Sequence, residues 1–368
     1  MALTITALDP TGIPRGLLEP LTAKAVLRLN DISTYLFTFD LTDPLATRLG
    51  PGWSLLIHDE GVRFSGAITS LTTTIDTTTT LEVTGKDELH RLADRLIYPD
   101  GKLESWRQTL SHYSRTQPAE TLIRWLIDAN AGPNTLPVRR SGNLRIGPGS
   151  GTGTGGSGAG PTLSIAERFT NLLETCQRIA SAGNIVFRIT YDDNRQLVLS
   201  TSVGKDLSRQ IRLEATGSIK TTAPTVNDIL IAGQGEGAAR TIVERTRTPS
   251  PWGHRIESFK DRRDTNDRPV LIREGEAALN EGAARISAAL TLTETPGTVF
   301  GVDFALGDRI TLLLASTEVT EQVTSATITW DGVGRTIDVG LGPEGETPPF
   351  LYEKFRDLDA RVRGLEKP

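Results

Sequence analysis

The sequence contains little of what several classes of protein require. Among its 368 residues there is one cysteine, Cys176, so no intrachain disulfide can form and folding needs no oxidising compartment. No apolar run of about 18 residues occurs, and the N-terminus lacks the pattern of a secretory signal. The histidines are too scattered for a zinc-binding helix motif; they are His58, His90, His112 and His254. These absences argue against a disulfide scaffold, a membrane span and a metal site.

Excess positive charge is also missing. The chain has 40 Lys and Arg against 45 Asp and Glu, a formal net charge of -5, which opposes tight binding to nucleic acid. Aromatic residues make up only 5% of the sequence, whereas threonine occurs 48 times. Because threonine is β-branched and suits pleated surfaces, this composition predicts a β-rich protein.

The length predicts two or three domains. Short β-branched and aromatic runs separated by Gly, Pro and Asp predict strands near both ends of the chain, with helical patterns between them. We therefore expect a mainly β fold with two similar small β-barrel domains, an α+β insert and a short C-terminal helix. The expected parts are a first barrel at 1–98, the insert at 99–215, a β segment at 216–262 that returns to the barrel region, a second barrel at 263–349 and the start of a coiled coil at 350–368.

Helix signals identify the insert. An apolar stripe predicts a helix from Pro118 to Ala131, which Gly132 and Pro133 end. A second helix is expected from Ser164, as the cap of a Ser-x-x-Glu box, to Gly183. Residues 147–160 contain eight glycines, which predicts a flexible surface loop. Farther along the chain, the alanine-rich run predicts another helix near residues 270–289.

An internal repeat is the most informative pattern. A Leu-Gly-x-x motif followed by an apolar strand begins at Leu49 and again at Leu306, and two further strand blocks follow each copy. The matching blocks are separated by 257, 260 and 256 residues, although generic strand patterns can produce part of this likeness. If the repeat is real, its two copies share a barrel core, for which we expect Trp53, Leu55, Ile57, Ile68 and Val83 in the first copy and Ile310, Leu312, Leu314, Ile328 and Val339 in the second.

The C-terminal tail carries an a/d pattern of apolar residues, at Leu351, Phe355, Leu358, Val362 and Leu365. Two heptads are too short for an independent coiled coil. The pattern therefore indicates either a helix that lies on its own domain or a trimerisation seam that forms because the chains already associate upstream.

Residues that could carry catalysis do not form a recognisable constellation. Cys176 lies on an apolar helical stripe, as a structural thiol does. Asp261, Asp264 and Asp267 lack the spacing of a calcium loop. The glycines of 233–238 are followed by a β-branched run, so we expect a bend between strands and no dinucleotide site. No cofactor, metal or catalytic residue is assigned, and we expect a protein that is not an enzyme.

Several blocks of the sequence resemble a known family, the minor tail proteins of siphophages that infect actinobacteria, also described as the baseplate hub or tail-associated protein. The likeness extends from about Leu21 to Gly342, and its motifs are structural in kind. The blocks are Leu92–Pro99, the helix from Pro118 with Asp128–Asn130, Asn171–Glu174, Ile231–Ala238, and Thr295–Asp303 with Leu306–Asp308.

The resemblance implies a homotrimer that closes the tail tube, docks on the ring of the distal tail protein and takes part in attachment and genome delivery. It also implies contacts with the tape measure protein and with a downstream tip or fibre protein. The protein would be located at the virion tail tip after assembly in the host cytoplasm. It would contact passing DNA only transiently. Two repeats in each of three chains would present six similar surfaces to a six-fold ring. A cell-wall-degrading enzyme and a host glycan-binding module are the alternatives.

Overall fold

The computed structural model describes residues 3–76, 79–147, 149, 158–247, 253–263, 265–292, 297–314, 317–331 and 334–342. Two expectations fall outside these residues: the C-terminal seam from Leu351 to Leu365, and all but the ends of the Gly-rich loop. Within the described ranges, no helix is long and apolar enough to span a lipid bilayer. The fold is mainly β, as the composition predicts.

The chain divides into two compact units. The first comprises Met1–Gly217 and Ala289–Leu341, and the second comprises Ser218–Ala288 together with Gly342. The divisions between the units lie after Gly217 and Ala288 and before Gly342. The predicted insert and the repeated sequence blocks that begin at Leu49 and Leu306 belong to the first unit.

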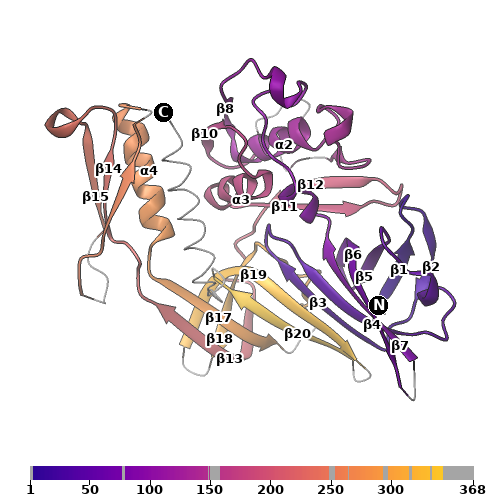
Figure 1. Ribbon diagram of the computed structural model, residues 1–368. Helices are drawn as coiled ribbons and strands as arrows, with labels where there is room; N and C mark the ends of the chain where they lie inside the picture. The colour runs from indigo at the N-terminus through magenta and orange to yellow at the C-terminus, as the bar shows by residue number, and fades with distance from the viewer. Residues whose placement is uncertain are drawn as a thin grey trace. The chain divides into compact units, whose positions relative to one another are not determined.

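Most strands of the described chain belong to one large sheet of twelve, in the order β18-β13-β17-β20-β19-β3-β4-β7-β6-β5-β1-β2 (Figure 1). The strands β13 and β17 carry the chain from one unit to the other and back. The bounds are β1 (Thr4–Leu8), β2 (Pro14–Leu18), β3 (Thr22–Arg28), β4 (Thr34–Asp40), β5 (Ser54–Asp59), β6 (Val62–Ile75), β7 (Thr79–Asp87), β13 (Arg212–Thr222), β17 (Arg285–Leu292), β18 (Arg309–Leu314), β19 (Thr317–Asp331) and β20 (Gly334–Leu341).

The strand order repeats within this sheet. The first copy reads β3-β4-β7-β6-β5 and the second reads β13-β17-β20-β19-β18, so each strand has a counterpart at the same place. In the first copy the long strand β6 pairs with β5 along its first half and with β7 along its second half. In the second copy the long strand β19 pairs in the same way with β18 and then with β20. The repeat seen in the sequence is therefore a repeat of topology.

The two copies close differently. In the second copy β18 also pairs with β19, so the strands form a closed ring of pairings. In the first copy β5 pairs with β1, and among the described residues it has no pairing with β3. We expected two similar barrels; the described chain has two copies of one strand order, and only the second closes on itself. The β1–β2 hairpin extends the first copy at the edge where closure would occur.

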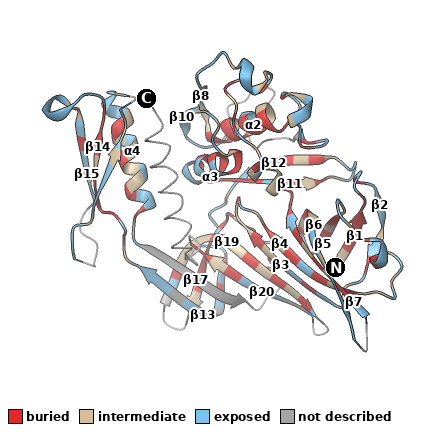
Figure 2. Ribbon diagram, viewed as in Figure 1, coloured by how far each residue is buried: buried red, intermediate tan, exposed pale blue. Residues whose placement is uncertain are grey.

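Alternating side chains build the core beneath this sheet. Tyr35, Phe37 and Phe39 of β4 are buried, while the residues between them face the other side. The rings of Tyr35 and Phe37 stack with centroids 5.0 Å apart. Figure 2 shows the same alternation of buried and less buried residues along the neighbouring strands. Burial on one face, at roughly 25 cal/mol per Å² of apolar area, fixes which face each strand presents.

The insert packs two helices over a small sheet. The elements are β8 (Tyr113–Pro118), α2 (Ala119–Asn130), β9 (Arg145–Ile146), β10 (Thr162–Glu167), α3 (Leu172–Gly183), β11 (Ile185–Tyr191) and β12 (Leu197–Val203), after the short α1 (His90–Ala93). The sheets have the orders β10-β8 and β11-β12-β9. Short 3-10 turns lie at η1 (Ala46–Arg48), η2 (Ser105–Arg107) and η3 (Pro137–Arg139). α2 occupies the predicted range, and its stripe of Leu122, Ile123, Leu126 and Ile127 is fully buried.

The predicted start of the second helix is wrong. Ser164 does not cap a helix, because it lies in β10 and pairs with Thr116 of β8. The helix α3 begins after Asn171, whose side-chain oxygen accepts a hydrogen bond from the Glu174 backbone amide at 3.2 Å. Pairing with β8 thus overrides a local capping pattern, and the same pattern recurs seven residues later with an asparagine in the capping position.

The second unit is a three-stranded sheet, in the order β15-β14-β16 within the described chain, covered on one face by a helix. Its elements are β14 (Asp228–Ala232), η4 (Gly237–Ala239), β15 (Ile242–Thr246), β16 (Glu257–Asp261) and α4 (Arg268–Glu281). The Gly233–Ala238 segment forms the bend between β14 and β15, as expected. The helix ends at Glu281, before the predicted end near 289, because Gly282 follows it and Arg285–Leu292 form β17.

Candidate assembly interface

The two copies of the repeat meet along one strand pair. The second half of β19 pairs antiparallel with β3, from Ser325 opposite Arg28 to Trp330 opposite Ala23. On its other side the same half of β19 pairs with β20. The strand β3 is therefore added to the second copy as an extra strand, and the sheet continues from one copy into the next.

A buried polar cluster fixes the end of this strand pair. The Trp330 indole Nε1 donates to the Asp59 carboxylate at 3.0 Å, and the Arg335 Nε lies 3.0 Å from the same oxygen. Arg335 also reaches Glu60 at 2.9 Å and donates to the Phe300 carbonyl oxygen at 3.0 Å. Burial raises the pKa of Asp59 above its usual range, although Arg335 and the indole N–H oppose the rise. The cluster joins the β5–β6 hairpin of one copy to β19 and β20 of the other.

Hairpin ends and bulges show which residues correspond between the copies. The β5–β6 hairpin closes at Asp59, and the β18–β19 hairpin closes at Leu314. One bulge lies after Ile68 in β6, and another lies after Val323 at the same place in β19. The counterpart of Trp330 in this register is Ile75, the last residue of β6. The second half of β6 is therefore the counterpart of the half of β19 that pairs with β3.

The residues expected to form the repeated core are placed as follows. In the first copy, Leu55, Ile57 and Val83 are fully buried, while Trp53 and Ile68 are half-buried. In the second copy, the side chain of Leu314 lies outside the described residues, whereas the others are fully buried: Ile310, Leu312, Ile328 and Val339. The structural register pairs Leu55 with Ile310 and Ile57 with Leu312, two residues away from the alignment that the sequence gives.

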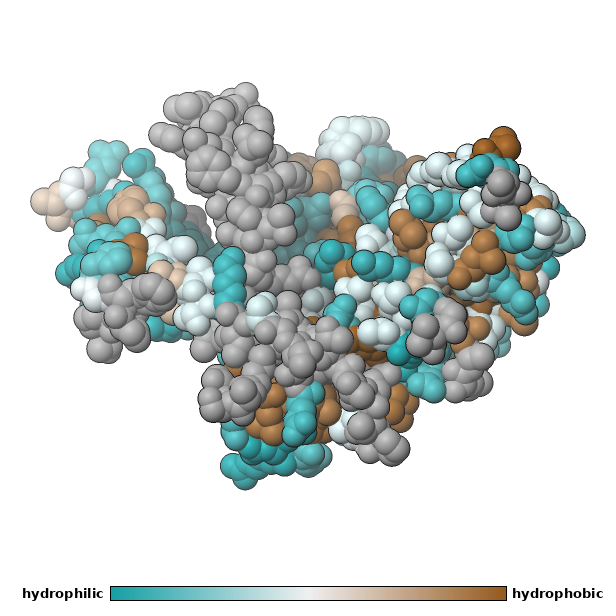
Figure 3. All heavy atoms as spheres, turned by 90° about the horizontal axis from the view of Figure 1, so that it is seen from below, coloured by the Kyte–Doolittle hydropathy of each residue, from teal (hydrophilic) through white to brown (hydrophobic). Residues whose placement is uncertain are grey.

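The second half of β6 has an unpaired edge. From Ser70 to Ile75 its backbone pairs with β7 on one side, and no described strand pairs with it on the other. Ile75 is 82% exposed, whereas its counterpart Trp330 is only 8% exposed. Figure 3 shows brown hydrophobic residues scattered among pale and teal ones on the face seen from below, so single exposed apolar residues are not unusual here. The combination of an exposed isoleucine and an open strand edge is distinctive, because such edges readily add another strand.

A second open edge belongs to the counterpart of β3. The strand β13 pairs with β18 only from Arg212 to Glu214, in parallel. Beyond Glu214 its one partner in the described sheet is β17. The counterpart of the β3–β19 joint would thus be a pairing of β13 with β6. Within one chain β6 and β13 are not neighbours in the sheet order. Each therefore has an uncovered edge, whereas their counterparts β19 and β3 cover each other.

Two of the residues considered for chemical roles are Cys176 and Asp261, which the structure describes. Cys176 is fully buried in α3, and burial raises the pKa of its thiol. Asp261 pairs with Arg240 and Arg263, and Asp264 lies outside the described residues. In the part of the chain that the structure describes, no group of three or more His, Cys, Asp and Glu side chains could hold a metal ion.

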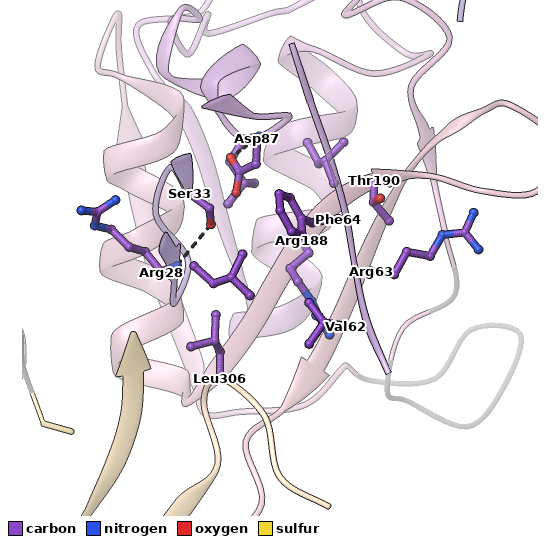
Figure 4. Close-up of a pocket in the computed structure, with 12 residues that line it drawn as sticks. Arg28, Ser33, Val62, Arg63, Phe64, Asp87, Arg188, Thr190 and Leu306 are labelled. Atoms are coloured by element: carbon purple, nitrogen blue, oxygen red, sulfur yellow. Dashed lines mark hydrogen bonds between the residues drawn. The ribbon is translucent and has the colours of Figure 1, made fainter. Parts of the chain in front are cut away.

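A small cavity lies between the large sheet and β11 (Figure 4). Its volume is about 40 Å³, and Arg28, Ser33, Asp87 and Arg188 are among the residues around it. Burial raises the pKa of Asp87 to about 7, although hydrogen bonds from Ser33 and the Leu89 amide oppose the rise. Asp87 is therefore a carboxyl that titrates near neutral pH inside the fold.

Asp87 predicts a pH dependence of stability. Because the folded state holds this proton up to about pH 7 and the unfolded state loses it near 3.8, the free energy of unfolding falls as pH rises between these values. The contribution of this carboxyl is about 4 kcal/mol when complete. We expect Asp87→Asn to remove this fall. In denaturant titrations, the free energy of unfolding of the variant minus that of the wild type should therefore increase from pH 5 to pH 8. A difference that stays constant with pH would contradict the prediction.

Comparisons with known proteins agree with this fold. Residues 20–343 match the model of a family described as Siphovirus ReqiPepy6 Gp37-like protein. The match confirms the resemblance to siphovirus tail proteins that the sequence motifs indicate. No curated protein matches the sequence.

Solved structures of phage tail proteins share the architecture. The tail protein from Neisseria meningitidis MC58 has a TM-score of 0.57 at 11% identity, covering 94% of this chain and 98% of its own. The 43 kDa tail protein of prophage MuSo2 from Shewanella oneidensis has a TM-score of 0.57 at 14% identity, covering 92% and 97%. The prophage tail protein gp18 from Listeria monocytogenes EGD-e has a TM-score of 0.51 at 11% identity, covering 98% and 99%. At these identities the likeness is one of fold.

Proposed function

The chain belongs to the siphovirus ReqiPepy6 Gp37-like family, and from this membership we propose that it is a structural baseplate hub protein of the phage tail tip, without catalytic activity. In this role three copies form a ring that closes the end of the tail tube. The ring adapts the six-fold distal tail protein to three-fold components of the tip and takes part in attachment and genome delivery. The tape measure protein and a downstream tip or fibre protein are the further partners.

The duplicated strand order carries this proposal. Within one chain, β3 of the first copy pairs with β19 of the second. The same joint formed between chains would place β13 of one chain beside the open edge of β6 in the next. Such a head-to-tail contact is heterologous, and it gives a closed ring when the rotation per chain returns to the start. Three chains with two copies each would then present six similar units to a six-fold partner.

Strand addition also accounts for the two open edges. An unpaired edge leaves backbone N–H and C=O groups without partners and invites aggregation, unless a partner covers it. Pairing of β6 with β13 would satisfy both of these edges in every chain at once. The exposed Ile75 would then lie at the place where Trp330 is buried in the internal joint.

The oligomeric mass tests this proposal. Analytical ultracentrifugation of the full-length chain across a range of concentrations should give a species of about three times the chain mass of 39.8 kDa. Electron microscopy of that species should show a ring. A chain that stays a monomer at all concentrations, and that also fails to bind the purified distal tail ring, would overturn the proposal.

A further inference from the structure

Two arginines and two aromatic residues of the insert and its leading segment form one row of contacts. The Arg139 guanidinium carbon lies 3.5 Å from the centroid of the Tyr98 ring. The rings of Tyr98 and Phe169 meet edge to face, with centroids 5.4 Å apart. The Arg168 guanidinium carbon lies 5.2 Å from the centroid of the Phe169 ring. We call these four residues the arginine–aromatic stack.

Hydrogen bonds hold the stack in place even though its backbone is strained. Phe169 has a φ of 54°, a left-handed conformation that is an outlier for an aromatic residue. Its amide donates to the Ile97 carbonyl oxygen at 2.7 Å, and the Ile97 amide donates to the Thr170 carbonyl oxygen at 2.9 Å. Arg168 Nη1 donates to the Ser111 carbonyl oxygen at 3.2 Å. The stack is therefore ordered before any partner arrives, which lowers the entropic cost of binding one.

Exposed apolar side chains adjoin the stack. Leu96, Leu110 and Val138 are all exposed. Val138 directly precedes Arg139, and Leu110 directly precedes the residue whose carbonyl oxygen Arg168 bonds. Arginine and aromatic residues are enriched in protein interfaces and carry much of the binding energy there. We call the stack and these three apolar residues the arginine–aromatic surface.

The positive charge of this surface is not cancelled within the described chain. Neither Arg139 nor Arg168 has a carboxylate partner among the described residues, and both donate to backbone carbonyl oxygens. Residues 95–183 contain ten Arg and Lys against six Asp and Glu, whereas the whole chain has a net charge of -5. Two of the six, Glu104 and Glu167, pair with other arginines. The surface therefore attracts carboxylates, which a guanidinium binds through two parallel hydrogen bonds.

The insert occurs once in the described chain, whereas the strand order of the large sheet occurs twice. It links β7 of the first copy to β13 of the second. A ring of three chains would therefore present six similar copies of the repeat but only three inserts. A six-fold partner can contact the six copies with nearly equivalent bonds, whereas three inserts match a three-fold partner.

We propose that the arginine–aromatic surface docks an acidic surface of the three-fold component of the tip, the downstream tip or fibre protein. This inference rests on the proposed function, because only a ring of three chains presents three inserts together. Carboxylates of the partner pair with Arg139 and Arg168, and its apolar side chains cover the exposed leucines and valine. Because the ring forms through the sheet edges, the insert stays available to this partner.

Calorimetric titration with the purified downstream tip or fibre protein tests this site. The wild-type ring should bind it with one site per chain, and the affinity should fall as salt rises. The double variant Arg139→Ala with Arg168→Ala should weaken binding at least tenfold and leave the mass of the ring unchanged. Arg145→Ala with Arg209→Ala is the matched control, since both arginines are exposed and lie outside the surface. It should bind like the wild type.

A second variant keeps the test decisive if loss of the stack disturbs the fold. Val138→Asp changes an exposed side chain and adds a negative charge beside Arg139. It should weaken binding of the downstream protein without changing the thermal midpoint or the mass of the ring. Binding of the purified distal tail ring should be the same in all variants, because that partner contacts the copies of the repeat.

The outcomes separate this inference from the proposed function. If the mass is that of three chains and both variants bind the downstream protein as tightly as the wild type does, the ring stands and this surface is not its docking site. Absence of binding to the wild-type ring has the same meaning. If the variants weaken binding of the distal tail ring instead, the surface docks the six-fold partner and the inference is wrong. If the mass is that of one chain, the proposed function and this inference fall together.

Discussion

Replacing Trp330 by alanine is expected to lower the free energy of unfolding by about 3 to 5 kcal/mol, as for other buried aromatic residues. The side chain is 8% exposed at the joint between the two copies of the repeat. Its loss removes apolar packing and leaves a cavity, and it also deprives the buried Asp59 carboxylate of the indole hydrogen bond. Urea titration followed by circular dichroism measures the change.

Two further variants separate these contributions. Trp330→Phe keeps a ring in the site but lacks the N–H, so it should cost about 1.5 to 3 kcal/mol, the usual contribution of a hydrogen bond to a charged group, while Arg335 stays beside Asp59. Trp125→Ala makes the same chemical change on α2, where the side chain is 43% exposed, and should cost clearly less than Trp330→Ala. If Trp330→Ala is as stable as Trp125→Ala, the joint between the copies does not contribute to the stability of the first unit.

Much of the fold could be predicted from local patterns. The helix α2 follows from its apolar stripe and the Gly-Pro stop, and the strands of the repeat follow from alternating β-branched residues. The alignment of the copies was less accurate, because a strand pattern of period two looks the same after a shift of two residues. Only the hairpin ends at Asp59 and Leu314 and the bulges after Ile68 and Val323 fix the register. No side-chain pattern in the sequence identifies those features.

Long-range contacts explain what the sequence could not predict. The Trp330 indole meets Asp59 across most of the chain, and the Asn30 side chain bonds Ile185 and Phe187 of the insert at 2.7 and 2.8 Å. Nothing near these residues in the sequence indicates such partners. The start of α3 was different, since Asn171 followed by Glu174 has the spacing of an N-cap signal. Ser164 offered the same spacing seven residues earlier, and its pairing with β8 was not visible from local sequence.

Identifying the candidate interface required both the sequence and the strand order of the structure. The serial threonines on both sides of Ile75 lie in the paired strands β6 and β7. No local pattern indicates that one edge of β6 is open, because edge pairing depends on strand order and not on composition. Comparison of Ile75 with Trp330 indicates that the open edge is a candidate interface. Ile75 is exposed in the chain, whereas its counterpart Trp330 is buried by β3 and Asp59.

We expect Ile75→Asp to dissociate the proposed ring while leaving the fold of each chain intact. Ile75 is 82% exposed, so an aspartate there should change the free energy of unfolding of the single chain by no more than about 0.5 kcal/mol. In the ring the same carboxylate would be placed within an apolar contact between β6 and β13, where burial of an unpaired charge is costly. Sedimentation should shift from three chains to one, and the thermal midpoint measured on dilute protein should stay unchanged.

Val138→Asp is the matched control for this variant, because Val138 is 85% exposed on the insert and undergoes the same change in charge. It should leave the mass at three chains, since the proposed ring forms through the sheet edges and not through the insert. Dissociation by both variants would mean that added negative charge alone separates the chains. Persistence of the ring in Ile75→Asp would mean that the edge of β6 lies outside the contact. Dissociation by Ile75→Asp alone would support strand addition at β6 as the contact that turns a duplicated chain into a ring.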